Sequence, residues 1–116
     1  MLWLALLLGC GEPVDDFATI ESEIFMPSCA YSSCHGGGEG GLILGQGMSY
    51  DELVGVEAVG VPGEIRVVPG DSAASYLMAK LNGTAGIVGD VMPPDAPLDA
   101  ELIDRVAAWI DAGAEP

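Results

Sequence analysis

The stretch that decides the fold reads Cys29-Ala-Tyr-Ser-Ser-Cys34-His35 and leads into the glycine-rich segment 36–41. Two thiols and the only imidazole of the chain therefore stand close together. The glycines after them disfavour regular structure, but they allow the backbone to pass close to a bulky group. This stretch thus joins side chains that form bonds to cofactors and metals with a loop that can approach one.

A helix is predicted immediately before the cysteines. Asp15 and Asp16 supply the acidic residues that a helix N-terminus favours. They precede an apolar stripe at helical spacing, made of Phe17, Ile20, Ile24 and Phe25. We expect Pro27 to end this helix, because proline has no backbone N–H to donate.

Further helices are predicted after the glycine-rich segment. One begins at Ser49, where Ser49 and Glu52 match a capping box. Another follows the capping residues of 69–72 and ends before Gly83. The last is the clearest, capped by Asp99, ended by Gly113 and lined on one face by Leu102, Val106, Trp109 and Ile110.

The segments between these helices are long and rich in glycine and proline, and segment 57–68 reads as an extended loop. No strand pattern and no repeat appears. The fold class is therefore all-α, with three to four short helices, and Tyr76 and Trp109 are expected in its core. Loops this long in so small a domain indicate that something other than protein fills the middle.

The spacing of the cysteines and the histidine indicates what that group is. In the haem attachment motif Cys-x-x-Cys-His, two thiols bond covalently to haem and the adjacent histidine ligates the iron. Here the spacer has four residues, which resembles a Cys-(four residues)-Cys-His-Gly block of small exported bacterial cytochrome-like domains. With a helix before the first cysteine, a Met-Pro in a late loop and an aromatic residue in the terminal helix, residues from about Asp16 to Gly113 resemble a monohaem class I cytochrome c.

That resemblance implies one covalent haem c, with Cys29 and Cys34 as thioether attachments, His35 as the proximal ligand and Met92 as the distal ligand, in a cytochrome c-like domain over residues 16–114. The residues agree, since a thioether is a soft ligand that suits iron and the prolines after Met92 restrict the backbone that presents it. Other methionines are available as ligands or as core residues, namely Met26, Met48 and Met78. With both axial positions filled, we expect an outer-sphere electron carrier and not an enzyme.

Two other interpretations of the cysteines stay open. A Cys29–Cys34 disulfide would staple a non-catalytic exported module with a binding or structural role. A zinc site would need four ligands, and adjacent Cys34 and His35 are poorly spaced to share one tetrahedral metal with Cys29. Arg66, the only basic residue in its loop region, is assigned either to a haem propionate or to the surface.

The N-terminal residues bear on location. Residues 1–9 form a short apolar run that ends at Leu-Leu-Gly-Cys10, which resembles the lipobox of bacterial lipoproteins. It implies a signal segment over 1–9, lipidation of Cys10 and a tether over 10–15. The protein is then exported and periplasmic or tethered to the outer membrane. The alternative is a buried N-terminal strand, and no Lys or Arg precedes Cys10.

The charge of the chain narrows its partners. Its 116 residues include 18 acidic and 3 basic side chains, for a formal net charge of −15, while half of them are hydrophobic. That hydrophobicity argues against intrinsic disorder. Arg66, Lys80 and Arg105 are too few to neutralise phosphates, which excludes nucleic acid. An acidic carrier instead fits a redox partner with a basic docking face.

Overall fold

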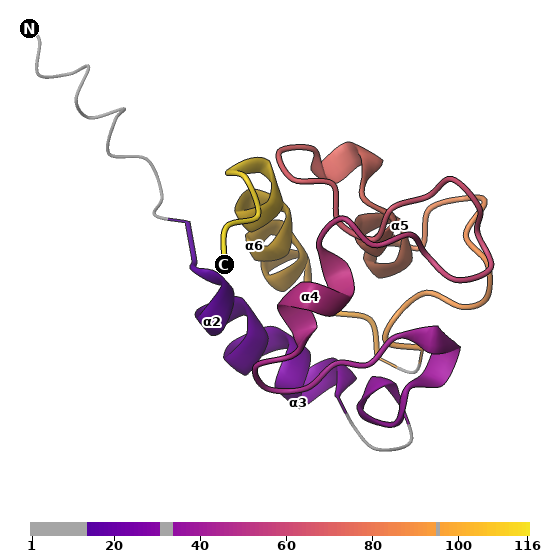
Figure 1. Cartoon of the computed structure of the whole chain (residues 1–116), viewed down its shortest axis with the longest axis horizontal. Helices are drawn as coiled ribbons and strands as arrows, with labels where there is room; N and C mark the ends of the chain where they lie inside the picture. The colour runs from indigo at the N-terminus through magenta and orange to yellow at the C-terminus, as the bar shows by residue number, and fades with distance from the viewer. Residues whose placement is uncertain (1–13, 31–33, 95) are drawn as a thin grey trace, which may run out of the picture.

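The computed structural model describes residues 14–30, 34–94 and 96–116, and helices supply the regular structure of these ranges (Figure 1). In the same ranges β pairing is limited to isolated bridges, such as that between Val54 and Val67. The all-α class is therefore confirmed. The elements follow in the order α2 (Phe17–Ile20), η1 (Glu21–Phe25), α3 (Met26–Cys29), η2 (His35–Gly37), η3 (Glu39–Gly41), α4 (Ser49–Leu53), η4 (Ser72–Ala74), α5 (Tyr76–Asn82) and α6 (Ala100–Asp111).

The first three elements form one continuous helix that passes through Pro27 and ends at Cys29. Its central part, η1, is a π-helical turn, and after it the N–H of Met26 donates to the carbonyl of Glu21. Pro27 then lies at the start of the next α-helical turn, a position where proline is tolerated. The prediction that Pro27 ends the helix before the cysteines is therefore wrong, and the π turn explains why.

The π turn also buries a charged side chain that organises the following loop. Glu21 is 7% exposed, and its carboxylate accepts hydrogen bonds from the N–H groups of Gly47, at 3.1 and 3.2 Å, and Ser49, at 3.3 Å. This carboxylate satisfies N–H groups at the start of α4 that have no partner within the helix. The loop before α4 is thus fixed to the first helix.

Helix α4 begins at Ser49 as predicted, but the capping box does not form. The hydroxyl of Ser49 donates to the carbonyl of Gly45, and Glu52 accepts a hydrogen bond from the N–H of Ile43 at 3.2 Å. The N–H groups at the start of α4 are therefore bound by Glu21, and not by the side chains of α4 that the sequence pattern indicated.

An aromatic cluster fills the space where α2, α4 and α6 meet. The ring of Phe17 lies 5.0 Å from Trp109 and 5.3 Å from Tyr50, measured between centroids. The polar ends of two rings bind the C-terminal segment, since Tyr50 donates to the carbonyl of Ala114 at 2.7 Å and Trp109 donates to that of Glu115 at 2.8 Å. Trp109 is a core residue, as expected.

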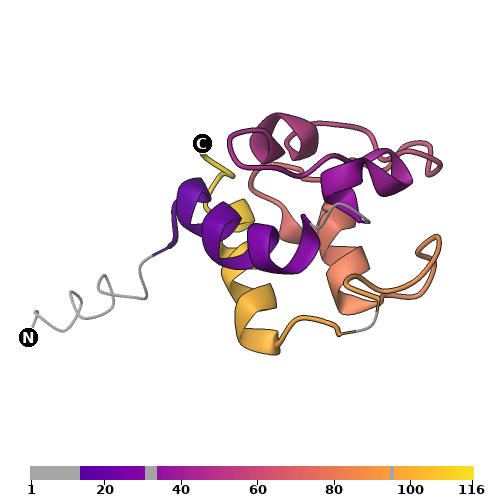
Figure 2. The same ribbon diagram turned by 90° about the horizontal axis from the view of Figure 1, so that it is seen from below.

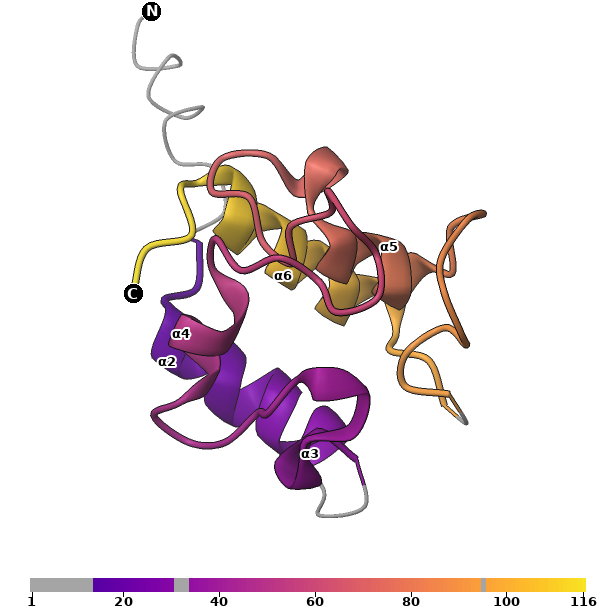
Figure 3. The same ribbon diagram turned by 45° about the vertical axis from the view of Figure 1, so that its right-hand side comes forward.

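Helix α5 lies beside α6 (Figure 3). Gly83 ends α5 in the left-handed conformation, as predicted. The side chain of Asp71 caps the preceding short turn η4 and not α5 itself, whose N-cap residue Ser75 makes no side-chain cap bond. At the start of α6 the main-chain carbonyl of Asp99 accepts hydrogen bonds from Leu102 and Ile103, whereas its side chain makes no cap bond.

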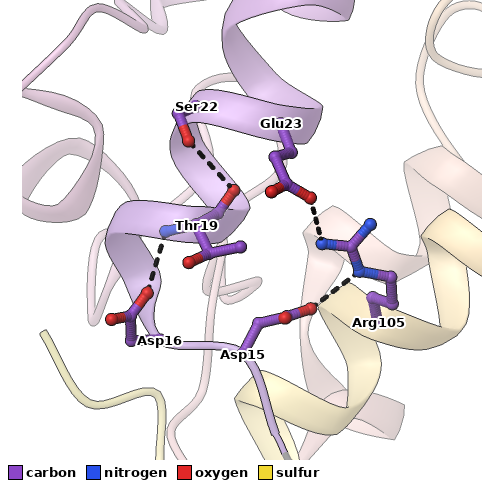
Figure 4. A network of polar contacts seen from close by, with 6 residues as sticks. All are labelled: Asp15, Asp16, Thr19, Ser22, Glu23 and Arg105. Carbon is purple, nitrogen blue, oxygen red and sulfur yellow. Dashed lines mark hydrogen bonds and ion pairs between the residues drawn. The ribbon is translucent and has the colours of Figure 1, made fainter.

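An ion-pair bridge joins the first helix to α6 (Figure 4). Arg105 donates to the carboxylates of Asp15 and Glu23, each at 2.7 Å. These hydrogen bonds raise the pKa of Arg105 above its ordinary value. Asp15 belongs to the segment 10–15 that was expected to be a tether, so the chain is already attached to α6 at that residue. Cys10 and the signal segment 1–9 lie outside the described residues.

Candidate functional site

A cavity of about 270 Å³ opens between α3, the glycine-rich segment, α5 and the loop 84–92. Figure 2 shows the glycine-rich segment and the loop 84–92 toward the same end of the molecule. The cavity wall is mainly apolar, with contributions from Phe25, Leu42, Leu44, Leu53, Leu77 and Leu81. Cys29, His35, Arg66 and Met92 line it as well. The structure therefore brings these sequence-predicted residues together, although they come from distant parts of the chain.

The glycine-rich segment positions His35. Instead of an irregular loop it forms two single 3₁₀ turns, η2 and η3, which meet at Gly38. Gly38 has a φ of +85°, a conformation that glycine adopts without steric cost. The expectation of an irregular segment is thus wrong, because the glycines permit sharp turns as well as disorder. The carbonyl of His35 accepts the N–H of Leu44 at 2.9 Å, which closes the turns.

The ring of His35 has a defined tautomer. Its Nδ1 lies 3.1 Å from the carbonyl oxygen of Leu42. A carbonyl can only accept, so Nδ1 donates this hydrogen bond, and in the neutral ring Nε2 then keeps its lone pair. This is the arrangement in which histidines bind metals, because an acceptor at one ring nitrogen fixes the orientation of the ring and leaves the other nitrogen for the metal. His35 is therefore prepared to act as a metal ligand.

Cys29 lies at the C-terminal end of α3 and Cys34 directly before η2, and the structure has both as thiols. Burial raises the pKa of Cys29 to about 11, and nearby Cys34 acts in the same direction. The thiol of Cys29 is thus mainly protonated at neutral pH. Cys34 is not among the residues that line the cavity. The spacer residues 31–33 lie outside the described ranges.

Met92 is the one methionine of residues 14–30, 34–94 and 96–116 that lines the cavity. Its N–H donates to the carbonyl of Lys80 at 2.8 Å, which attaches this part of the loop to α5. Of the other candidates, Met78 is buried in the core and Met48 is 50% exposed, while Met26 belongs to α3. Among these methionines only Met92 has a position from which it could ligate a group in the cavity.

Arg66 is buried at the cavity wall, only 7% exposed, so its assignment to the surface is wrong. Its guanidinium donates to the carbonyl of Glu52 at 2.8 Å and to that of Gly41 at 3.0 Å, and it lies 3.8 Å from the Glu52 carboxylate. A guanidinium has five N–H donors, so these contacts leave others for an anionic group. Arg66 thereby connects α4 to the glycine-rich segment.

Two further polar residues of the cavity wall were not predicted there from the sequence. Tyr76, expected in the core, lines the cavity, and so does Lys80. The Tyr76 hydroxyl accepts the N–H of Val88 at 2.9 Å, and the Lys80 ammonium donates to the carbonyl of Val88 at 2.7 Å. Their separation of four residues, which places them on one helix face, is the signal that could have paired them.

The side chains that commonly bind metals do not cluster in the part of the chain that the structure describes. No group of three or more His, Cys, Asp or Glu residues there could hold a metal ion. Cys29, Cys34 and His35 thus do not form the multi-ligand set that a zinc site requires. The possible ligands that line the cavity are the imidazole of His35, the thioether of Met92, the thiol of Cys29 and the carboxyl group of Asp90.

Within residues 14–30, 34–94 and 96–116, every helix is too short or too polar to cross a membrane. Comparison of the chain with protein-family models, with curated proteins and with solved structures found no match.

Proposed function

We propose that this chain is a monohaem c-type cytochrome that carries electrons by outer-sphere transfer, with a cytochrome c-like domain over residues 16–114. One observation carries the proposal. Cys29, His35 and Met92 come from three separate segments, yet all of them line one mainly apolar cavity. A thiol, an imidazole and a thioether around an apolar space are the groups needed to attach and ligate haem.

The donor set fits haem c. His35 would bind the iron through Nε2 and Met92 through its thioether sulfur, while Cys29 and Cys34 would provide the covalent attachments. Arg66 would pair with a propionate, through the N–H donors that Glu52 and Gly41 leave. The bound haem would supply an iron that gains and loses one electron, at a potential that a methionine ligand raises.

The chain's own residues would set the conditions for that electron. The carbonyl of Leu42 holds His35 in the tautomer with a free Nε2. The leucines of the wall exclude water, which lowers the local dielectric constant. If His35 and Met92 both ligated the iron, no coordination position would be left for a substrate, and we therefore infer an electron carrier and not an enzyme.

Location and partners belong to the same proposal. Lipidation of Cys10 would anchor the exported domain at the membrane surface, in the periplasm or at the outer membrane. The net charge of −15 would attract a redox partner with a basic docking face. Salt screens such attraction, so the electron-transfer rate would fall as ionic strength rises.

The test is to produce the full chain in a host with a haem-attachment pathway and to record its visible spectrum and intact mass. We expect a mass increase of one haem and a c-type spectrum, both lost in Cys34→Ser. Met92→Ala keeps the attached haem but changes the spectrum and the reduction potential. Met48→Ala, which removes an exposed methionine, is the matched control and leaves both unchanged.

A colourless protein would refute the cytochrome. If its mass were also lower by two hydrogen atoms and its folding depended on oxidation, the chain would be the module stapled by a Cys29–Cys34 disulfide. An unchanged potential in Met92→Ala would instead refute only the distal ligand.

A further inference from the structure

The loop 84–92 encloses one side of the cavity with little burial of its own. Val88, Gly89, Asp90 and Met92 all line the cavity. Residues 84–86 and 88–90 are nevertheless exposed, and Val88 is 59% exposed. Segments with few buried apolar contacts open easily unless polar contacts hold them. The position of Met92 therefore depends on what attaches this loop.

Hydrogen bonds from α5 provide that attachment. At Val88, in the middle of the loop, the hydroxyl of Tyr76 accepts the N–H and the ammonium of Lys80 donates to the carbonyl, at 2.9 and 2.7 Å. At the end of the loop the carbonyl of Lys80 accepts the N–H of Met92 at 2.8 Å. Both polar main-chain groups of Val88 are thus bound by side chains of one helix face.

Helix α5 is a firm support for these bonds. Its first residues are paired with the adjacent segment, since the N–H of Tyr76 donates to Ile65 and that of Leu77 donates to Arg66, both at 2.9 Å. Met78 and Leu81 anchor the helix in the core with 6% and 3% exposure. When the loop moves, α5 therefore stays in place.

We propose that Tyr76 and Lys80 are positioning residues that hold Met92 at the cavity by clamping the loop at Val88. The proposal rests on the cytochrome function for its effect on ligation, whereas the clamp itself concerns only the loop. Removing either side chain leaves Val88 attached to α5 by one hydrogen bond instead of two. The loop then opens more often, and Met92 competes less well with an external ligand for its place.

The test compares Tyr76→Phe and Lys80→Leu with the wild-type holoprotein. Tyr76→Phe removes one oxygen and keeps the ring, and Tyr50→Phe is its matched control, because Tyr50 donates to Ala114 away from the cavity. The probe is imidazole, titrated into the oxidised protein while the spectrum is recorded. Lys80→Arg, which keeps a cationic donor, tests rescue.

We expect the apparent affinity for imidazole to rise about tenfold in Tyr76→Phe and Lys80→Leu, the effect of one lost hydrogen bond. Lys80→Arg and Tyr50→Phe remain near the wild-type affinity. Hydrogen exchange at the amides of Val88 and Met92 accelerates in the first two variants, while thermal unfolding shows that all of them are folded. A merely structural role of Tyr76 would lower the melting temperature without changing imidazole affinity.

Unchanged imidazole affinity and unchanged amide exchange in Tyr76→Phe would overturn the clamp. If the wild-type protein were colourless, the cytochrome proposal would fail separately. Amide exchange at Val88 would then still decide whether Tyr76 and Lys80 hold the loop.

Discussion

Where α2, α4 and α6 meet, side chains fill the space between the helices, whereas the side chains between α3, α5 and the loop 84–92 enclose a cavity of about 270 Å³. On the packed side, Trp109 and Ile110 are almost completely buried. On the cavity side, Leu77 is only partly buried, and a guanidinium forms part of the wall.

This difference in packing shows which side of the molecule is stabilised by its own side chains and which side a bound group could stabilise further. Close-packed interiors gain dispersion energy from every neighbour, so the packed side needs no further component. The cavity side lacks such neighbours, and a ligand that fills it adds its binding free energy to the stability of the fold. The contrast therefore supports a resident group in this cavity.

The largest expected effect comes from removing the same number of carbon atoms on each side. Ile110→Ala on the packed side costs about 2–5 kcal/mol, because it opens a new cavity in a filled core. Leu77→Ala costs less, below about 2 kcal/mol, because this side chain is only partly buried and lies at the cavity wall. Urea unfolding of the protein without haem measures both free energies.

Equal losses for Ile110→Ala and Leu77→Ala would contradict the contrast. The same measurement with haem attached tests the contrast further. The loss of unfolding free energy caused by Leu77→Ala should then increase, whereas the loss caused by Ile110→Ala should stay the same.

A smaller effect is expected at Gly41, whose φ is +77°. A Cβ at this position would lie 2.8 Å from Cγ2 of Val59 and 3.2 Å from its Cβ, so the segments must move apart. Gly55 has a φ of +75° with nothing within 4 Å of such a Cβ, which makes Gly55→Ala the matched control. Both variants lose about 1–2 kcal/mol from the left-handed backbone, and Gly41→Ala loses about 1 kcal/mol more, the low end of an overpacking cost, because Val59 is 64% exposed and can shift.

Urea unfolding of the two glycine variants checks this difference. Because the carbonyl of Gly41 accepts a hydrogen bond from Arg66, Gly41→Ala should also displace that guanidinium and weaken haem retention. Similar unfolding free energies for Gly41→Ala and Gly55→Ala would show that the glycine-rich segment accommodates a Cβ at position 41 without an additional steric cost.

Much of the packed side could be predicted from the sequence, because its information is local. The apolar stripe after Asp16, the turn chemistry at Gly83 and the periodicity of the last helix each indicate an element by themselves. The π turn could not be predicted in this way. It depends on the buried contacts of Glu21 with Gly47 and Ser49, which are more than twenty residues away.

The cavity was predictable only in part, for a similar reason. Cys29 and His35 belong to the motif, and Met92 stands before prolines, so the sequence alone singled out these three residues of the cavity wall, whereas Cys34 of the same motif does not line it. Arg66 was left open between two roles, because its burial depends on carbonyl groups of Glu52 and Gly41. Lys80 carried no motif at all, and only the fold brings it to Val88.

The smallest expected effect concerns Asp16, on the packed side. Its carboxylate accepts the N–H of Thr19 at 2.9 Å and caps α2, and these hydrogen bonds lower the pKa of Asp16 below its ordinary value. A carboxyl whose pKa is lowered by folding stabilises the protein above its unfolded pKa and loses that contribution as pH falls through the lowered value. Asp16→Asn keeps an oxygen acceptor at the cap but removes the charge.

The melting temperature of Asp16→Asn should therefore lie below that of the wild type at neutral pH, and the two should converge as the pH falls through the lowered pKa. Glu64→Gln, at an exposed position, measures how much any single neutralisation relieves the repulsion within a chain of net charge −15. If Asp16→Asn and Glu64→Gln shifted the melting temperature equally at every pH, the charge of Asp16 would make no contribution to the stability of the cap. Since Asp16 does not line the cavity, its effect should be the same with and without haem, which distinguishes it from substitutions on the cavity side.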